Sequence, residues 1–262
     1  MHAYIRCLLL VIPMFTATSC TIAPPPEPRL VAHLDSLAAQ NDRAPRGFGV
    51  VICGDNETRH IYSSRLAVAA LQRKGFQYIF QLGVVERASK TNIDFVFAYL
   101  ARMVNAQDVV WVHFSGHGRW SVFPRWQIPT PGIHGLIKFT PATRLQSGGA
   151  AGAVIEEGVI TPHELTDYLS AIQPRFGVAV IGGCYSGRFA ERLSRWIIMT
   201  SSKANERSYG EFEPAIYARM LASTNAEIGL WFDGAQGSCK HSHPQIVRGS
   251  GCEQNIVIPD FR

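Results

Sequence analysis

The chain alternates short, wholly apolar segments with longer segments in which apolar residues recur every three or four positions. The short segments predict strands buried on both faces, and the periodic segments predict helices that cover them. This alternation is typical of an α/β fold, with a mostly parallel sheet between helices. The expected strands are 47–53, 78–82, 109–114, 176–181 and 196–200, and the expected helices are approximately 64–74, 91–104, 161–172, 188–194 and 213–222.

Two helix starts can be read from polar residues. Thr161 and Glu164 enclose Pro162, which predicts a capping box with proline at the first helical position. Thr91-Asn92 is expected to cap the start of the helix at 91–104. Beyond residue 222 the pattern weakens, and it predicts no further element.

Two of the expected strands end at a reactive residue between glycines. His117 lies in a Ser-Gly-His-Gly segment after strand 109–114, and Cys184 lies in a Gly-Cys-Tyr-Ser-Gly segment after strand 176–181. Functional residues of parallel sheets gather at the carboxyl ends of the strands. If these strands are neighbours, the imidazole and the thiol lie within a few ångströms, as nucleophilic thiol catalysis requires.

The flanking glycines have a role in the same chemistry. Gly118 and Gly183 allow sharp turns and a close approach of the backbone to a substrate. The backbone N–H groups of Cys184 and Gly118 are therefore expected to form an oxyanion hole. The positive end of the helix expected at 188–194 would assist it.

The motifs resemble those of the legumain family of caspase-like cysteine peptidases. Gly118 and His117 match the His-Gly motif of this group, and Cys-Tyr-Ser-Gly at 184–187 is similar to the Cys-x-Ser-Gly motif of legumains. Thr-Arg-His at 58–60 is similar to the Tyr-Arg-His segment of legumains and of the glycosylphosphatidylinositol transamidase catalytic subunit. Residues 200–210 resemble the stretch after the catalytic strand of bacterial members. The likeness covers 47–222, in the family's order.

The resemblance implies a caspase-like three-layer sandwich that hydrolyses peptide bonds through His117 and Cys184, without a metal or organic cofactor. It also implies an S1 pocket that holds Arg59, with Ser208 near its far wall. Legumains carry an acid two positions before the cysteine, which helps to bind a P1 asparagine, but this chain has Gly182 there. Arg59 without that acid favours an acidic or amide P1 residue. Alternatively, Arg59 pairs with a surface carboxylate, and Ser208 caps a turn or only packs.

Three other functions fit parts of the sequence. An α/β-hydrolase would use Cys184, Asp233 and His241 or His243 in that order, but its nucleophile elbow needs glycine at position 186, where this chain has serine. A non-catalytic binding module has no reason to retain both Cys and His. A transpeptidase or transamidase would use the same dyad and the same acyl-enzyme, with an amine in place of water.

The N-terminus predicts export. Residues 1–19 have a basic residue, a short apolar stretch and small residues before Cys20, which is typical of a signal peptide. Ala-Thr-Ser-Cys at 17–20 resembles a bacterial lipobox, so Cys20 is expected to carry a lipid at the cell envelope, with plain periplasmic secretion as the alternative. Residues 20–46 begin with a proline-rich tether, and 47–262 form the peptidase domain.

Export also affects what is expected of the cysteines. Cys239 and Cys252 are expected to form a disulfide in an oxidising compartment. Cys239 with His241 and His243 is an alternative metal site, although the spacing matches no standard zinc pattern. Cys53 is expected to be buried.

The net charge of +5 comes from scattered Lys and Arg, so no nucleic-acid partner is expected. Segment 119–158, rich in Pro and Gly, is either a substrate-facing flap or an insertion.

Overall fold

The computed structural model describes residues 25–26, 28–38, 45–55, 57–85, 88–119, 136–138, 159–224, 226–252, 256–259 and 261. The expected signal peptide at 1–19, Cys20 and most of segment 119–158 lie outside these residues. Within the described ranges, no helix combines the length and the apolar character needed to cross a bilayer.

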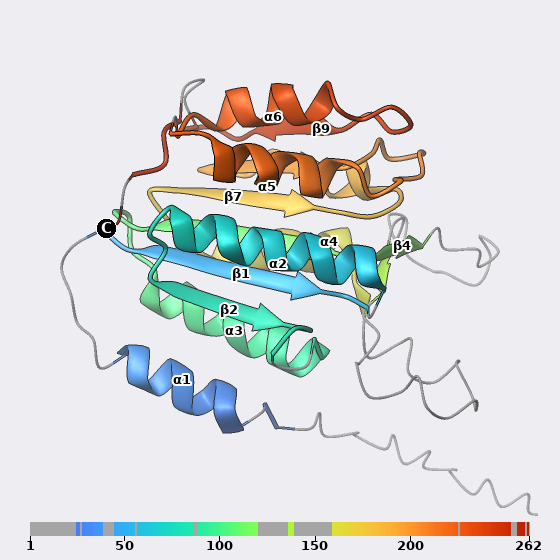
Figure 1. Ribbon diagram of the computed structural model, residues 1–262. Coiled ribbons are helices and arrows are strands. Elements are labelled where there is room, and N and C mark those ends of the chain that lie inside the picture. Colours follow the sequence, from blue (N-terminus) through green and yellow to red (C-terminus); the bar gives the residue numbers. More distant parts are fainter. Residues whose placement is uncertain are drawn as a thin grey trace, which may run out of the picture.

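A six-stranded sheet forms the centre of the molecule, in the order β2-β1-β3-β7-β8-β9 (Figure 1). The first five strands are parallel, and β9 pairs with β8 in the antiparallel direction. The long strands are apolar because both faces are covered: every residue of β1, β3, β7 and β8 is buried. The strands are β1 (Gly47–Cys53), β2 (Tyr78–Leu82), β3 (Val109–Ser115), β7 (Phe176–Ile181), β8 (Trp196–Thr200) and β9 (Gln245–Arg248).

Helices form a layer on each side of this sheet, and the alternation of side chains along each strand divides the core in two. Val112 and Phe114 of β3 pack with α1 (Pro28–Ala38), α3 (Lys90–Met103) and α4 (Pro162–Ala171). Val109 and Trp111 pack on the opposite side with α2 (Thr58–Arg73), α5 (Phe212–Ala222) and α6 (Ile228–Gln236). The predicted three-layer α/β sandwich is therefore confirmed.

The predicted elements agree with the structure best where burial is complete. The five predicted strands have the expected bounds, apart from one more residue, Ser115, at the end of β3. The capping box of α4 is present, with both reciprocal hydrogen bonds. The predicted cap of α3 was wrong, because Ser89 accepts the hydrogen bond from Asn92 N–H. Helix α6 and strand β9 were not predicted.

A second, small sheet begins directly after β3. It is formed by β4 (His117–Arg119), β5 (Leu136–Lys138) and β6 (Val159–Ile160), in that order and antiparallel. His117 is therefore the first residue of a strand that turns out of the central sheet directly after β3. The backbone at His117 is therefore held by β3 of the central sheet, two residues before it, and by its own pairing with Lys138 of β5.

Candidate active site

Strands β3 and β7 are direct neighbours, which meets the condition for the predicted pairing of His117 with Cys184. Phe114 pairs with Ile181, so the turns that follow the two strands leave the sheet at the same edge. The turns touch through their glycines: a Cβ at Gly118 would lie 1.7 Å from the carbonyl oxygen of Cys184. Gly183 has a φ of +130°, and a Cβ there would lie 2.7 Å from the carbonyl oxygen of Gly116. Only glycine allows this approach, which brings His117 and Cys184 to one place.

A small pocket lies at this edge of the sheet. It includes four of the five predicted catalytic and substrate-binding residues, and the fifth, Gly118, contacts Cys184 through the backbone. The pocket is lined by Arg59, His60, His117, Cys184, Ser208 and Glu213, together with glycines at 116, 183 and 210. Residues from four segments that are distant in sequence thus surround one cavity beside a thiol.

The turn that carries Cys184 is fixed by two buried serines of the loop after β8. Gly183 N–H donates to Ser201 Oγ at 3.0 Å, and the hydroxyls of Ser201 and Ser202 donate to the carbonyl oxygen of Gly183 at 3.1 and 3.2 Å. Ser202 N–H donates to Ser186 Oγ at 3.1 Å. Cys184 Sγ itself lies 3.6 Å from the carbonyl oxygen of Ser208. The polar groups beside the thiol are therefore held in place before a substrate binds.

The predicted helix after Cys184 was wrong. Residues Ser186–Phe189 form a single 3-10 turn (η2), and no regular element follows until β8. Tyr185 has a left-handed conformation (φ 62°), and its N–H donates to the carbonyl oxygen of Glu206 at 2.7 Å. A four-residue turn has no macrodipole of the size expected for a helix. The proposed assistance from a helix terminus therefore does not exist.

His117 contacts carboxylates from the segment after β1. Its Nε2 forms a hydrogen bond with Glu57 Oε1 and lies 3.8 Å from Asp55 Oδ2. The hydrogen bond to His117 is the main cause that lowers the pKa of Glu57. Because Nε2 is engaged in this way, Nδ1 is the ring nitrogen that remains for proton exchange with a thiol.

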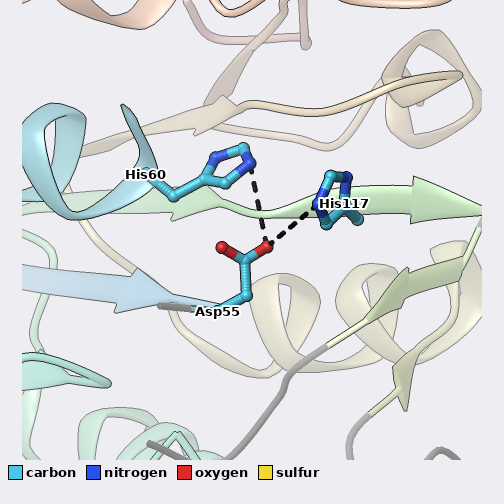
Figure 2. Close-up of side chains that lie close together, drawn as sticks. All are labelled: Asp55, His60 and His117. Carbon is cyan, nitrogen blue, oxygen red and sulfur yellow. Dashed lines mark ion pairs between the residues drawn. The ribbon is translucent and has the colours of Figure 1, made fainter. Parts of the chain in front are cut away.

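His60 lies against the same carboxylates but is buried. Its Nε2 lies 3.7 Å from Asp55 Oδ2 (Figure 2). Its Nδ1 lies 2.9 Å from Ser115 Oγ. Burial is the main cause that lowers the pKa of His60, so the ring is neutral near pH 7. Arg59 Nε–H donates to His60 Nε2 at 3.2 Å, which identifies Nε2 as the acceptor and Nδ1 as the protonated nitrogen.

Arg59 lines the pocket with Cys184, where the resemblance placed it. Its Nε also lies 2.9 Å from Glu57 Oε2, which is the carboxylate contact that the sequence offered as the alternative. Ser208 also lines the pocket, and its Oγ accepts a long hydrogen bond from Gly210 N–H at 3.4 Å. The pocket therefore has a cationic wall that is already partly neutralised by a carboxylate.

The sequence did not identify Glu213, the acid of this pocket. Glu213 is the second residue of α5, is 1% exposed, and has an Oε2 without a hydrogen-bond partner in the described part of the chain. Burial raises its pKa to about 7, while its own backbone N–H and the charge of Arg59 act in the opposite direction. Asp55, Glu57 and His60 were also missed as site residues. Their position after β1, at the same edge as His117, was the available signal.

The C-terminal histidines lie outside this pocket. His241 Nδ1 lies 2.8 Å from Glu211 Oε1, and His243 Nδ1 pairs with Glu206 Oε1. Neither histidine lines the cavity next to Cys184. This arrangement gives no support to the Cys184–Asp233–His order of an α/β-hydrolase.

The predicted disulfide is not present, because Cys239 and Cys252 are free thiols. Strand β9 separates them. Lys240 N–H donates to Glu211 at the pocket edge of the sheet, whereas Gly249 N–H donates to the carbonyl oxygen of Trp196 at the opposite end of β8. The two cysteines therefore lie in the loops at opposite ends of β9, whose four residues span roughly 13 Å. Cys53 is free and buried, as expected.

The sequence matches no protein-family model and no curated protein. Among solved structures, the chain is similar to caspase-1 from Spodoptera frugiperda, with a TM-score of 0.50 over 79% of this chain and 90% of that chain. The two sequences are 13% identical, so the likeness concerns the fold alone. Together with the six-stranded, mostly parallel sheet between two helical layers, it shows that the chain has a caspase-like fold.

Proposed function

We propose that the chain is a cysteine endopeptidase of the legumain-like kind, with Cys184 as nucleophile and His117 as general acid and base. The observation that carries the proposal is the single pocket in which these two residues meet Arg59 and Glu213. A thiol and an imidazole beside a pocket with two ionisable groups provide both the reaction and a means to select a side chain.

The reaction follows from the roles of the two residues. His117 Nδ1 takes the proton of the Cys184 thiol, and the thiolate attacks the carbonyl carbon of the scissile peptide bond. The backbone N–H groups of Cys184 and Gly118 stabilise the oxyanion. When the C–N bond breaks, the leaving amine takes the proton from His117, and a thioester remains on Cys184. His117 then deprotonates a water molecule, which attacks the thioester and releases the acid, and the thiol is restored.

The pocket favours a P1 side chain that accepts at one end and donates at the other. Arg59 supplies a cation with hydrogen-bond donors, and Glu213 supplies a carboxyl oxygen without a partner. An amide side chain satisfies both groups, because its oxygen accepts from the guanidinium and its NH₂ donates to the carboxylate. We therefore propose a P1 asparagine or glutamine. Glu213 would take the place of the acid that legumains carry two positions before the cysteine, where this chain has Gly182.

The experiment combines active-site labelling with a P1 library. Cys184→Ala and His117→Ala should each abolish labelling by a thiol-directed acyloxymethyl ketone, whereas His241→Ala and His243→Ala should leave it unchanged. A library with fixed P1 residues should show cleavage after amide side chains, and Glu213→Ala should reduce that preference. Mass spectrometry of the products with and without an added amine separates hydrolysis from transfer. Labelling that survives in Cys184→Ala would contradict the proposal.

We also propose that the chain is exported and held at the envelope by a lipid on Cys20. The support is the sequence of residues 1–20, which precede the described part of the structure. Expression of the chain in a Gram-negative host, followed by fractionation, tests this: Cys20→Ala should move the protein from the membrane to the soluble fraction. A variant that stays in the membrane fraction would disprove the lipid anchor.

A further inference from the structure

Three side chains with metal-ligating atoms meet at one point, and one of them is the imidazole of His117. Asp55 Oδ2, His60 Nε2 and His117 Nε2 all lie within 4.8 Å of one another, and Asp55 Oδ2 lies between the two rings (Figure 2). The Asp55–His60 distance is 3.7 Å and the Asp55–His117 distance is 3.8 Å. These three residues are called the Asp-His-His cluster below.

The central carboxylate oxygen of the cluster lacks a hydrogen-bond partner. The Asp55 side chain is 7% exposed, and its Oδ1 accepts from Glu57 N–H at 2.9 Å. Its Oδ2 is buried and receives no hydrogen bond from any described residue, although it faces both imidazoles. A buried carboxylate oxygen without a partner is costly, and a cation between Asp55 and the two rings would satisfy it.

The nitrogen atoms of the cluster can take the form that a metal needs. His60 Nδ1 is engaged by Ser115 Oγ, which leaves the lone pair on Nε2, where it accepts from Arg59 Nε–H. A second-shell contact of this kind fixes the tautomer of a ligating histidine. On His117 the proton moves from Nε2, which contacts Glu57, to Nδ1. Two imidazoles and one carboxylate form a borderline-soft donor set, which suits Zn²⁺ better than Ca²⁺ or Mg²⁺.

Two of the three distances are close to those of a tetrahedral site, and the third, between the Nε2 atoms of the two histidines, is at most 4.8 Å. Zinc binds nitrogen and carboxylate oxygen at about 2.0–2.2 Å, so its ligand atoms lie about 3.4 Å apart. Two of the three edges of the cluster exceed this value by 0.3 and 0.4 Å. The His117 side chain is 43% exposed, so it has room to approach Asp55. The buried pair, Asp55 and His60, must close the remaining 0.3 Å between them.

We propose that the Asp-His-His cluster is a zinc site, and that its occupation switches the peptidase off. Glu57 is the nearest candidate for the fourth ligand, because its Oε1 contacts His117 Nε2 and its Oε2 lies 4.0 Å from His60 Nε2. Two carboxylates, Asp55 and Glu57, outweigh the single guanidinium of Arg59, so the local charge attracts a cation.

The consequence for activity rests on the proposed function. A zinc ion on Nε2 of His117 leaves the proton of the neutral ring on Nδ1. The nitrogen that should accept the proton of the Cys184 thiol then has no lone pair to offer, and the ring cannot act as a base. Arg59 must also leave His60 Nε2 when the metal binds, which makes the site weaker than a structural zinc site and reversible.

The test measures metal binding separately from catalysis. Purified, untagged Cys184→Ala chain is titrated calorimetrically with Zn²⁺ and, for its absorption spectrum, with Co²⁺. We expect one equivalent to bind and the Co²⁺ spectrum to indicate tetrahedral coordination. Asp55→Asn and His60→Gln should each weaken binding by at least about tenfold. Asp55→Asn conserves the shape of the side chain, so it keeps the test valid if His60→Gln does not fold.

The matched control is His163→Gln. His163 also lies 3.7 Å from a carboxylate, that of Asp167, but both side chains are exposed. This variant should bind zinc as the parent does. Equal affinity in all variants, or loss of binding in the Cys184→Ala chain itself, would overturn the proposal, since the second result would place the ion on the thiol.

Activity is measured afterwards with the wild-type chain. Zinc should inhibit cleavage and a chelator should restore it, and Asp55→Asn should shift the inhibiting concentration by the same factor as the binding constant. If the metal-free chain cleaves nothing, the proposed function fails while the binding result stands. If zinc binds at the cluster and cleavage continues unchanged, the site exists and the proposed switch is wrong.

Discussion

Glu213 occupies the space that a side chain at position 182 would fill. A Cβ at Gly182 would lie 1.8 Å from Glu213 Oε1, a distance that real Cβ contacts do not reach. The acid in the pocket and the glycine two residues before Cys184 are therefore one structural feature. The missing side chain on β7 is the reason why a carboxyl group from α5 can enter the pocket.

This relationship predicts strong non-additivity between the two positions. Gly182→Ala should destabilise the chain by roughly 1–3 kcal/mol, because the new methyl group overlaps the Glu213 carboxyl. Glu213→Ala removes the obstacle, so the double variant should be less destabilised than the sum of the single variants. Urea unfolding of the four chains measures the interaction energy. Additive effects would mean that Glu213 turns away from Gly182 at no cost.

Glu213 also predicts how stability depends on pH. Burial raises its pKa from 4.5 to about 7 in the folded chain, so the folded state binds this proton more tightly than the unfolded state. The contribution is complete below pH 4.5 and is lost as the pH rises through 7. The loss amounts to roughly 3 kcal/mol.

Glu213→Gln cannot ionise, so the comparison isolates this contribution. The free energy of unfolding of the wild type should fall, relative to that of Glu213→Gln, as the pH rises from 5 to 8. Asp233→Asn, on the neighbouring helix α6, serves as the control and should follow the wild type. Parallel curves for the wild type and Glu213→Gln would show that the carboxyl group is not buried as described.

The same residues show which parts of the fold and the site could be predicted from the sequence and which could not. The strand bounds could be predicted because complete burial leaves an apolar run, and the meeting of His117 and Cys184 followed from the edge at which parallel strands end. Glu213 could not be predicted, because a polar residue in the first turn of a helix normally faces water. The prediction of a helix after Cys184 was wrong for a reason that lies far away in the sequence. Gly187 packs so closely against Ala204 that a Cβ at Gly187 would lie 2.5 Å from the amide nitrogen of Ala204.

Ser201 is predicted to support the turn of the nucleophile. Ser201→Ala leaves the buried N–H of Gly183 without an acceptor and takes one donor from the Gly183 carbonyl oxygen. An unsatisfied buried group costs about 1–3 kcal/mol, so the variant should lose that much stability and label more slowly with a thiol reagent. Ser170→Ala, an exposed position on α4, should change stability by less than about 0.5 kcal/mol. Equal effects in the two variants would remove the supporting role.

Glu57 is predicted to position His117. Its carboxylate holds Nε2 of the ring and is itself held by Arg59 Nε at 2.9 Å. Glu57→Gln retains the size of the side chain, but its NH₂ group cannot accept a hydrogen bond, so the amide cannot accept from both His117 Nε2 and Arg59 Nε. We expect kcat/KM to fall by up to about a hundredfold, mainly through kcat, because misplacement of a catalytic group by about 1 Å has costs of this order.

The pH profile distinguishes positioning from a merely structural role. The pKa of Glu57 is lowered, chiefly by its hydrogen bond to His117, so the contact is complete above pH 4.5 and is lost only as the pH falls through the lowered value. The acid limb of kcat/KM should therefore change shape in Glu57→Gln, while Glu191→Gln, whose carboxylate accepts from Thr166 on the surface, should keep the wild-type profile. If Glu57→Gln lowers stability and activity together and leaves the profile intact, Glu57 only holds the fold.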